Sequence, residues 1–414
     1  MSNLSTSRMP EHWFALIVLA VLALLPLGGS AEVPLCAGAA VGMVLVWRNR
    51  AELSSNVGAK LVVGLFLCYW LPALISAPGS VAPHKTWSTV VVLLRFLPFA
   101  LFACIGLCRS DIWPRIIAAC AAITVLWLLD AWVQIFTGYS LAGVMSEERL
   151  SGIFGTNLKL GPVLAVLSPF VFVVARERFG WRGLALAFAF QLMPILMAGS
   201  RAGWLMFGLV TLVFVWREAK SLKRFFFFAL SAACVVVVAA TVAWYASPAF
   251  DARVQRSLLA LQGSQHAVDE ASAGRLRIWG TAVRMFEAHP INGVGARGFR
   301  YAYPTFAEPG DTFVDDTADE GASHAHQIVL EVASETGVLG LILWLVGASI
   351  AMRAWLRANG PARQRAFAPA LSLAVMCFPL DTHLAFYSAW WGLLFWWLLS
   401  LYCAALNAES ANDA

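Results

Sequence analysis

Two histidines stand directly before a long apolar segment in the stretch from Ser323 to Val346. Histidine is the side chain whose charge changes near neutral pH, so His324 or His326 could take a proton from a hydroxyl group. A zinc site is less favoured, because no third ligand is obvious and the His-x-His spacing does not place both rings on one helix face. The alternative is an interfacial pair with no chemical task.

An arginine interrupts the apolar stretch from Gly183 to Trp216, which is too long for one membrane span. We expect Arg201 to cap a tight hairpin between two helices. A guanidinium near the membrane is costly unless it is paired or lines a wet cavity, and its fork-shaped donors suit phosphate oxygens. Arg201 therefore either binds an anion or only reaches to the interface and marks the turn.

A second arginine, Arg275, lies near the start of an expected amphipathic helix with Ser272 as its N-cap. Its apolar face consists of Trp279, Ala282, Val283 and Phe286. A cation near a helix N-terminus opposes the macrodipole, but this cost vanishes where an anion binds to the terminal amides. The alternative is a surface helix with solvated arginines, to which Arg277 and Arg284 would belong.

Three polar residues after the histidines share one helical face, because Gln327, Glu331 and Glu335 follow one another at four-residue spacing. Gly337 and Gly340 then interrupt the pattern before a purely apolar run. We therefore expect a short helix followed by a membrane span.

Two further stretches carry candidate residues. Asp381 and His383 stand in the short turn before the last apolar run, where an acid is a functional candidate or merely holds the turn. Arg149 and Lys159 stand in another polar stretch. With these, the candidates are Arg149, Arg201, Arg275, His326 and Asp381, with His324 as the alternative histidine.

The elements that position these residues are membrane helices. Of the 414 residues, 60% are hydrophobic and 13% are charged, whereas soluble domains carry roughly a quarter charged residues. Continuous apolar runs favour helices over a barrel, and the fold class is an all-α polytopic membrane protein. All eight cysteines fall in or beside apolar runs, which indicates neither a disulfide framework nor a metal site.

We expect about twelve spans, with soft boundaries. They cover residues 13–29, 33–47, 60–77, 87–107, 114–136, 158–175, 183–199, 202–216, 225–246, 328–352, 366–381 and 384–405. The first of these could instead be a signal peptide, but a second apolar run follows almost at once. Alternate loops are rich in Lys and Arg, and the rule that positive charge stays inside places both termini in the cytoplasm.

One loop on the outer side is much longer than the others. From Ser247 to His326 it holds seven Arg, no Lys and ten Asp or Glu. The net charge of +5 therefore belongs to the cytoplasmic loops and gives no reason to expect nucleic acid. The expected organisation is spans one to nine in 1–246, a partly helical periplasmic loop in 247–327, three spans in 328–405 and a cytoplasmic tail in 406–414.

The candidate residues all fall on the outer face, which has no ATP, so chemistry there needs an activated donor. A sugar linked to a lipid diphosphate is such a donor. Arginines would neutralise the charge that develops on the leaving diphosphate, and a histidine would activate the acceptor hydroxyl. No Mg²⁺ would be required if arginine does this work. The acidic run from Val314 to Glu320 is interpreted as a solvated loop.

Three motifs in this order resemble those of the O-antigen ligase and polymerase superfamily, over roughly residues 129–400. The pattern R-x-x-x-W matches Arg275 and Trp279, and hP-x-x-G-x-G matches His289–Pro290 and Gly293–Gly295. The pattern H-N-x-x-L-x-x-x-x-E-x-G matches His326, Leu330, Glu335 and Gly337, with Gln327 in place of the usual Asn. The stretch around Arg201 and the residues from Leu129 to Gly155 are also similar to the family.

The resemblance implies a function. The enzyme would transfer O-antigen polysaccharide from undecaprenyl diphosphate to the lipid A-core oligosaccharide, at the periplasmic face of a Gram-negative inner membrane and without a cofactor or metal. Arg201 and Arg275 would bind the diphosphate, and His326 rather than His324 would be the general base. Direct attack by the acceptor would invert the anomeric carbon. Arg149 and Asp381 are further candidates.

Other functions remain open. Within the superfamily, a polymerase joins glycan repeat units and another branch glycosylates proteins. From a different class, a transporter would place charged or broken segments near the middle of the membrane and show internal repeats. We find no convincing repeat of the two halves, and the charged residues gather at the outer boundary.

Overall fold

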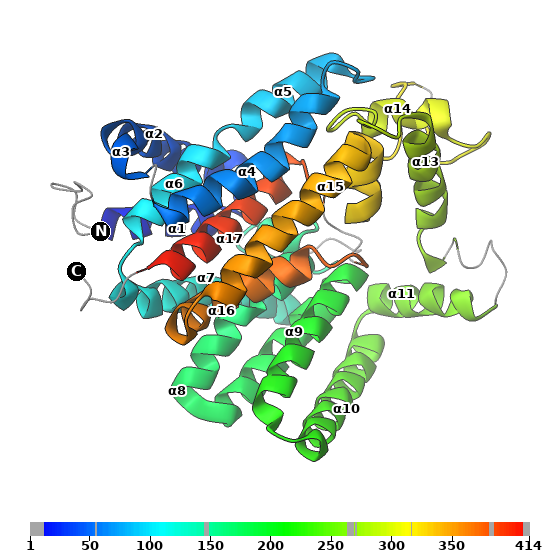
Figure 1. The fold of residues 1–414 in the computed structure, drawn as a ribbon. Coiled ribbons are helices and arrows are strands. Elements are labelled where there is room, and N and C mark those ends of the chain that lie inside the picture. The colour runs from blue at the N-terminus through cyan, green and yellow to red at the C-terminus, as the bar shows by residue number, and fades with distance from the viewer. Residues whose placement is uncertain are drawn as a thin grey trace.

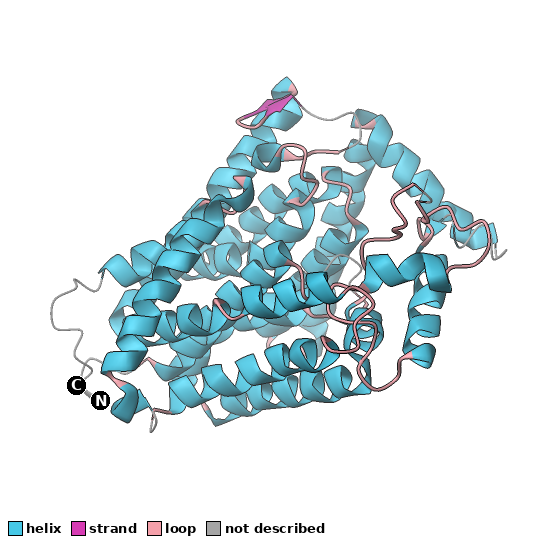
Figure 2. Cartoon of the chain, turned by 90° about the horizontal axis from the view of Figure 1, so that it is seen from above, coloured by secondary structure: helices cyan, strands magenta, loops and turns pink. Residues whose placement is uncertain are grey.

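The computed structural model describes residues 12–53, 56–144, 149–262, 269, 271–315, 317–380 and 385–408. This part of the chain is almost entirely helical. Its two-stranded antiparallel hairpin pairs β1 (Tyr139–Ser140) with β2 (Gly143–Val144), and Figure 2 shows it at one edge of the molecule. The all-α class predicted from the composition is therefore confirmed.

The helices fall into two halves of the chain. The first half consists of α1 (His12–Ala23), η1 (Gly28–Ala31), α2 (Glu32–Arg48), α3 (Arg50–Leu53), α4 (Val57–Ser76), α5 (Pro83–Leu93), α6 (Phe96–Gly106), η2 (Ser110–Ile112), α7 (Trp113–Thr137) and η3 (Gly152–Phe154). The second half consists of α8 (Leu160–Met197), α9 (Arg201–Ala219), α10 (Leu222–Ala246), α11 (Pro248–Leu258), η4 (Leu259–Gln262), α13 (Arg275–Ala288), α14 (Phe299–Phe306), α15 (Ile328–Arg357), α16 (Gly360–Met376) and α17 (Ala389–Asn407).

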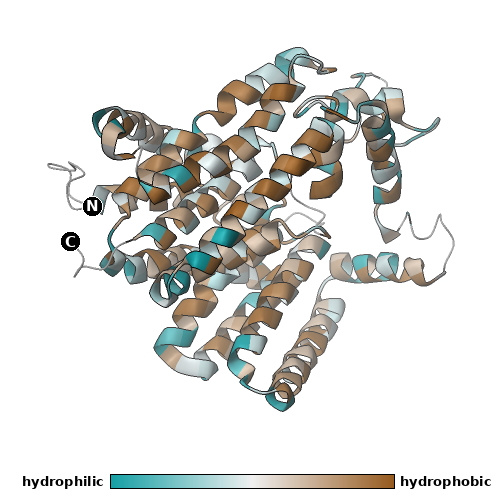
Figure 3. Cartoon of the chain, viewed as in Figure 1, coloured by the Kyte–Doolittle hydropathy of each residue, from teal (hydrophilic) through white to brown (hydrophobic). Residues whose placement is uncertain are grey.

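Nine helices among the described residues are long and apolar enough to cross a membrane. One of them, α8, breaks at Gly180, where φ is 66° and ψ is −156°, and so contains two of the twelve expected spans. The remaining two expected spans correspond to the shorter helices α1 and α16, of 12 and 17 residues. The chain is a polytopic membrane protein, and Figure 3 shows mostly apolar residues along α9 and α10, with hydrophilic residues near the turn that joins them.

The centre of the bundle is α17, which packs against α16, α6 and α4 (Figure 1). Its Trp396 and Trp397 are fully buried. The indole nitrogen of Trp397 donates to the carbonyl oxygen of Val18 in α1 at 2.8 Å. This contact makes the first apolar segment a part of the packed bundle, as expected for a membrane span.

The segment between α10 and α15 is partly helical, as the sequence predicts, and Figure 1 shows α13 and α14 beside the start of α15. It has a small apolar core of its own, formed by Ile278, Ala282, Met285, Val294, Phe299, Ala302, Tyr303, Ala322 and Ala325. This core gives the segment a fixed shape on the end of the bundle where α9 and α15 begin.

Candidate active site

The helix that carries Arg275 starts at that residue. Its N-cap is Gly274, with φ 74°, and Ala273 before it also has a positive φ of 59°. The prediction that Ser272 caps the helix is wrong: two successive left-handed residues turn the chain first, and the Ser272 hydroxyl donates to the carbonyl oxygen of Asp269 at 2.7 Å. Within the described part of the chain no side chain caps this terminus, so its first amides have no side-chain partner there.

The same helix holds the chain just before the candidate base. Trp279 follows Arg275 by one turn, and its indole nitrogen donates to the carbonyl oxygen of Ala325 at 3.1 Å. Ala325 is fully buried and precedes His326. The R-x-x-x-W motif therefore joins a candidate anion-binding residue to the peptide that presents the histidine.

Loss of the indole donor tests this connection. Trp279→Phe keeps the ring but removes one hydrogen bond, which typically contributes about 1 kcal/mol and corresponds to a several-fold change in rate if the bond orients the histidine loop. We expect the turnover number to fall by about 3- to 10-fold, with an apparent Tm close to that of the wild type. The exposed Trp216 provides the control, because Trp216→Phe should leave turnover unchanged. Equal turnover in the Trp279 variant would disprove the positioning role.

The two histidine rings lie together. Their centroids are 3.9 Å apart with an interplanar angle of 45°. His324 Nδ1 is 2.9 Å from the hydroxyl oxygen of Ser323. His326 has a φ of 54°, which is unusual for a residue with a Cβ and is often found at functional sites. The geometry brings both candidates to one place and does not by itself choose between them.

The helix after the histidines begins as expected, and Gln327 is its N-cap. The side-chain oxygen of Gln327 accepts from the amide of Leu330, and its side-chain nitrogen donates to the carbonyl oxygen of Pro379 at 2.9 Å. The Gln found where the family has Asn thus connects α15 to the turn before α17. Asp381 and His383, predicted in that turn, lie outside the described residues.

The two glutamates of this helix face inward and hold neighbouring segments. Glu331 and Glu335 are both 0% exposed. A Glu331 oxygen accepts from the amide of Phe386 at 2.7 Å, and a Glu335 oxygen accepts from the amide of Arg297 at 2.8 Å. The guanidinium of Arg297 also acts electrostatically on both carboxylates. The shared face predicted for Gln327, Glu331 and Glu335 is therefore an anchoring face, and sequence reasoning missed Arg297.

The second and third motifs pair with each other through the backbone. Helix α15 breaks at Gly337, where φ is 67°, as expected from the interruption in the pattern. At this break the amide of Val338 donates to the carbonyl oxygen of Pro290 at 2.8 Å, and the amide of Val294 donates to that of Ser334 at 2.8 Å. The motif residues 289–295 and 335–337 thus form one structural unit.

This pairing requires glycine. A Cβ on Gly293 would lie 2.3 Å from the carbonyl carbon of Glu335, and φ at Gly293 is +66°. Gly293→Ala combines a left-handed backbone with overpacking, and we expect it to lower the free energy of unfolding by about 3 kcal/mol. Gly310→Ala is the control, because Gly310 has φ +78° and open space around it, and it should lower that free energy by only about 1 kcal/mol. Similar shifts in the apparent Tm of both variants would contradict the close approach.

Arg201 is the first residue of α9 and Ser200 is the N-cap. This agrees with the prediction that Arg201 lies at a tight hairpin between two helices. One guanidinium nitrogen of Arg201 donates to the carbonyl oxygen of Ala271, in the chain that leads to Arg275. Arg201 therefore contacts the segment that immediately precedes α13. The structure connects Arg201, Arg275 and His326 through neighbouring peptides at one end of the bundle.

Further arginines surround Arg201. Arg149 and Arg256 lie close enough to act on its charge, and the amide of Leu150 donates to the carbonyl oxygen of Met197 at 3.3 Å. The guanidinium of Arg253 lies against Gly199, because a Cβ there would be 1.8 Å from its Nη1. We define the arginine cluster as Arg149, Arg201, Arg253 and Arg256. Like charges held this close repel one another, and an anion between them would relieve the repulsion.

The sequence could have indicated the two residues from α11. Arg253 and Arg256 are three residues apart on a short amphipathic helix, and therefore share a face. Phe250 of the same helix is buried and packs against Trp204 of α9 in a tilted arrangement, with ring centroids 5.5 Å apart. This contact fixes α11 beside the start of α9.

The other candidate cation of the outer face is held differently. The Lys159 amine lies over the ring of Trp390 at 4.2 Å from its centroid. Burial lowers the pKa of Lys159. Lys159 therefore connects the chain before α8 to the start of α17.

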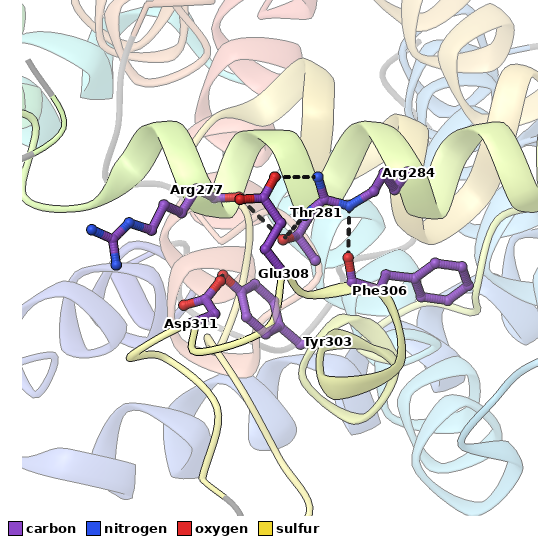
Figure 4. A network of polar contacts seen from close by, with 7 residues as sticks. All are labelled: Arg277, Thr281, Arg284, Tyr303, Phe306, Glu308 and Asp311. Carbon is purple, nitrogen blue, oxygen red and sulfur yellow. Dashed lines mark hydrogen bonds and ion pairs between the residues drawn. The ribbon is translucent and has the colours of Figure 1, made fainter. Parts of the chain in front are cut away.

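The other arginines of α13 are structural. Arg284 Nε donates to the carbonyl oxygen of Phe306 at 2.7 Å, and its Nη1 pairs with Glu308 at 3.0 Å (Figure 4). Below them the Tyr303 hydroxyl donates to Asp311 at 2.9 Å, and burial raises the pKa of this phenol. Arg277 pairs with Asp269 at 2.8 Å. Arg277 and Arg284 therefore have defined protein partners, whereas the alternative interpretation expected solvated side chains.

An apolar crevice of about 270 Å³ lies along α9, the helix that Arg201 begins. It lies between the second part of α8, α9 and α10, and Ile195, Trp204, Phe207 and Ala232 are among its lining residues. Trp204 is one turn after Arg201 on α9. The crevice and the arginine cluster are therefore neighbours along α9.

Among the described residues, no group of three or more His, Cys, Asp or Glu side chains is arranged to hold a metal ion. The arrangement combines the arginine cluster with a pair of histidines at one end of a helical bundle. These features define a multi-pass membrane protein in which basic and histidine side chains gather at one end of the bundle.

Residues 184–345 match the family model described as O-antigen ligase. This segment contains Arg201, Arg275 and His326 and runs from the second part of α8 into α15. This segment of the chain is therefore similar to the O-antigen ligase family. No curated protein matches the chain.

Proposed function

We propose that this protein is an O-antigen ligase of the bacterial inner membrane. It transfers a polysaccharide from undecaprenyl diphosphate to the lipid A-core oligosaccharide. The observation that carries this proposal is the connection of the arginine cluster to the histidine loop through Ala271, α13 and Trp279. The family match over the same residues supports the class of reaction.

The donor binds through its diphosphate. Arg201 and Arg275 provide paired donors that fit phosphate oxygens, and Arg149 and Arg256 add positive charge. The apolar crevice below Trp204 accommodates part of the isoprenoid chain. The glycan then extends toward α13 and the histidine loop, on the periplasmic side. The orientation with both termini in the cytoplasm follows from the distribution of Lys and Arg.

The reaction is a single displacement. His326 takes the proton of the acceptor hydroxyl while its oxygen forms a bond to the anomeric carbon. The bond from this carbon to the diphosphate oxygen breaks, and the leaving diphosphate keeps the electron pair. Arginine side chains stabilise the added negative charge without a metal ion. Attack opposite to the leaving group inverts the anomeric carbon.

The choice of His326 over His324 rests on the family motif and on two local features. His326 has a strained backbone conformation with a positive φ, whereas the Nδ1 of His324 is hydrogen-bonded with the Ser323 hydroxyl. Arg149 belongs to the arginine cluster and is proposed to assist diphosphate binding. Asp381 stays a candidate outside the described residues.

The position of the candidate residues favours an enzyme over a transporter. Arg201 and His326 lie at one end of the bundle, joined through the segment from Ala271 to Ala325. A transport path would instead distribute such residues along the membrane.

Bacteria that lack this chain test the proposal. We expect them to accumulate full-length glycan on the carrier lipid and to carry lipid A-core without it. The wild-type chain should restore the glycan on lipid A-core. Single repeat units attached to lipid A-core in the absence of the chain would instead make it a polymerase, and unglycosylated proteins would make it a protein glycosyltransferase.

A further inference from the structure

A second basic site lies at the opposite end of α9. Arg217 follows Arg201 by 16 residues, a separation of about 24 Å at 1.5 Å per helical residue. A cavity of about 640 Å³ opens there between the end of α9, the start of α10 and α16. Its polar lining comes from Arg217, Lys220 and Ser221. This cavity is therefore on the membrane face opposite to the candidate active site.

The cavity continues into an apolar groove. Val213 and Phe367 line both the cavity and a groove of about 640 Å³ bounded by α4, α15, α16 and α17. The groove lining reaches Phe386, and the described residues that form it include no charged side chain. A basic opening thus leads to an apolar space that extends toward the other face of the membrane.

Several features of the opening favour an anion. The Arg217 guanidinium stacks on the ring of Phe367 at 4.2 Å from its centroid, which holds it at the rim. Lys223 and Arg224 occupy the first turn of α10, where cations oppose the helix macrodipole unless an anion is bound. The nearby acid Glu218 pairs with Arg176 at 2.8 Å, so its charge is already balanced.

We propose that this cavity and groove bind one anionic phospholipid from the leaflet opposite to the active site. The phosphate lies at Arg217 and Lys220, and an acyl chain occupies the apolar groove. Basic pockets between membrane helices bind anionic lipid headgroups through the same combination of charge and apolar surface. The charged end of the groove faces away from the arginine cluster, so its occupant is a different lipid from the glycan donor.

Native mass spectrometry of the detergent-solubilised full chain tests the proposal, with phosphatidylglycerol or phosphatidylethanolamine added. We expect phosphatidylglycerol to remain bound and phosphatidylethanolamine to dissociate. The double variant Arg217→Gln/Lys220→Gln should lower phosphatidylglycerol retention by about 10-fold, because two basic contacts are lost. The matched control is Arg178→Gln/Arg182→Gln, which removes two exposed cations on either side of the α8 break, one of them close to Trp181. It should leave retention unchanged.

A groove-filling variant tests the acyl chain separately. Ala374 lines the groove and is exposed, so Ala374→Phe fills the groove without disturbing the core. Retention of phosphatidylglycerol should fall in this variant too, while the apparent Tm stays close to that of the wild type. Equal retention of both lipids, equal loss in the Arg178/Arg182 control, or full retention with a filled groove would each overturn the proposal.

Discussion

His326→Ala is expected to abolish glycan transfer while the protein still inserts and folds. General base catalysis typically contributes about 100- to 10,000-fold to a rate, and alanine leaves the acceptor hydroxyl without its proton acceptor. His326 is only partly buried and lies in a loop before α15, so its loss should leave the packing of the bundle intact. The measurement is the turnover number of the purified variant, beside its thermal unfolding curve.

His324→Ala is the matched control. The two ring centroids are 3.9 Å apart in a tilted arrangement, so removal of His324 changes the surroundings of the base but leaves it in place. We expect at most a several-fold loss of turnover. An inactive His324 variant together with an active His326 variant would reverse the assignment of the base.

Arg275→Lys is expected to be nearly as damaging, although it keeps the positive charge. A lysine is a point charge and cannot make the paired contacts of a guanidinium fork to a diphosphate. Arg275 is also the first residue of α13, so a diphosphate bound at this terminus would meet both the guanidinium fork and the helix amides. We expect kcat/KM to fall by about 100-fold, the size of effect seen when one donor to a developing oxyanion is removed.

The control for this variant is Arg284→Lys on the same helix. Arg284 is held by Phe306, Glu308 and Thr281 and belongs to the structure of the outer segment (Figure 4). Its replacement should lower the apparent Tm, and it should lower kcat/KM much less than Arg275→Lys does. An Arg275→Lys enzyme with normal kcat/KM would exclude this arginine from diphosphate binding.

Helix positions and the order of the motifs could be predicted from the sequence, because apolar runs and glycine breaks are local signals. The interruption at Gly337 and the hairpin at Arg201 are examples. The pairing of residues 289–295 with the α15 break could not be predicted in detail, since it depends on backbone contacts between segments distant in the chain.

The arginine cluster was only partly predicted for the same reason. Arg253 and Arg256 have the spacing of any surface amphipathic helix, and only the contact of Phe250 with Trp204 places them near Arg201. Arg297 follows a glycine-containing turn, and nothing in the neighbouring sequence indicates that its charge acts on two buried glutamates. The prediction of Ser272 as the N-cap is wrong because two left-handed residues, one of them an alanine, lie between Ser272 and the first residue of the helix.

Reconstituted transfer tests the central claim most directly. The purified chain in nanodiscs would receive an undecaprenyl-diphosphate glycan and lipid A-core, with EDTA present. We expect the glycan to appear on lipid A-core with an inverted anomeric linkage. Growth of the glycan on the carrier lipid, or no transfer to lipid A-core by a demonstrably folded sample, would contradict it.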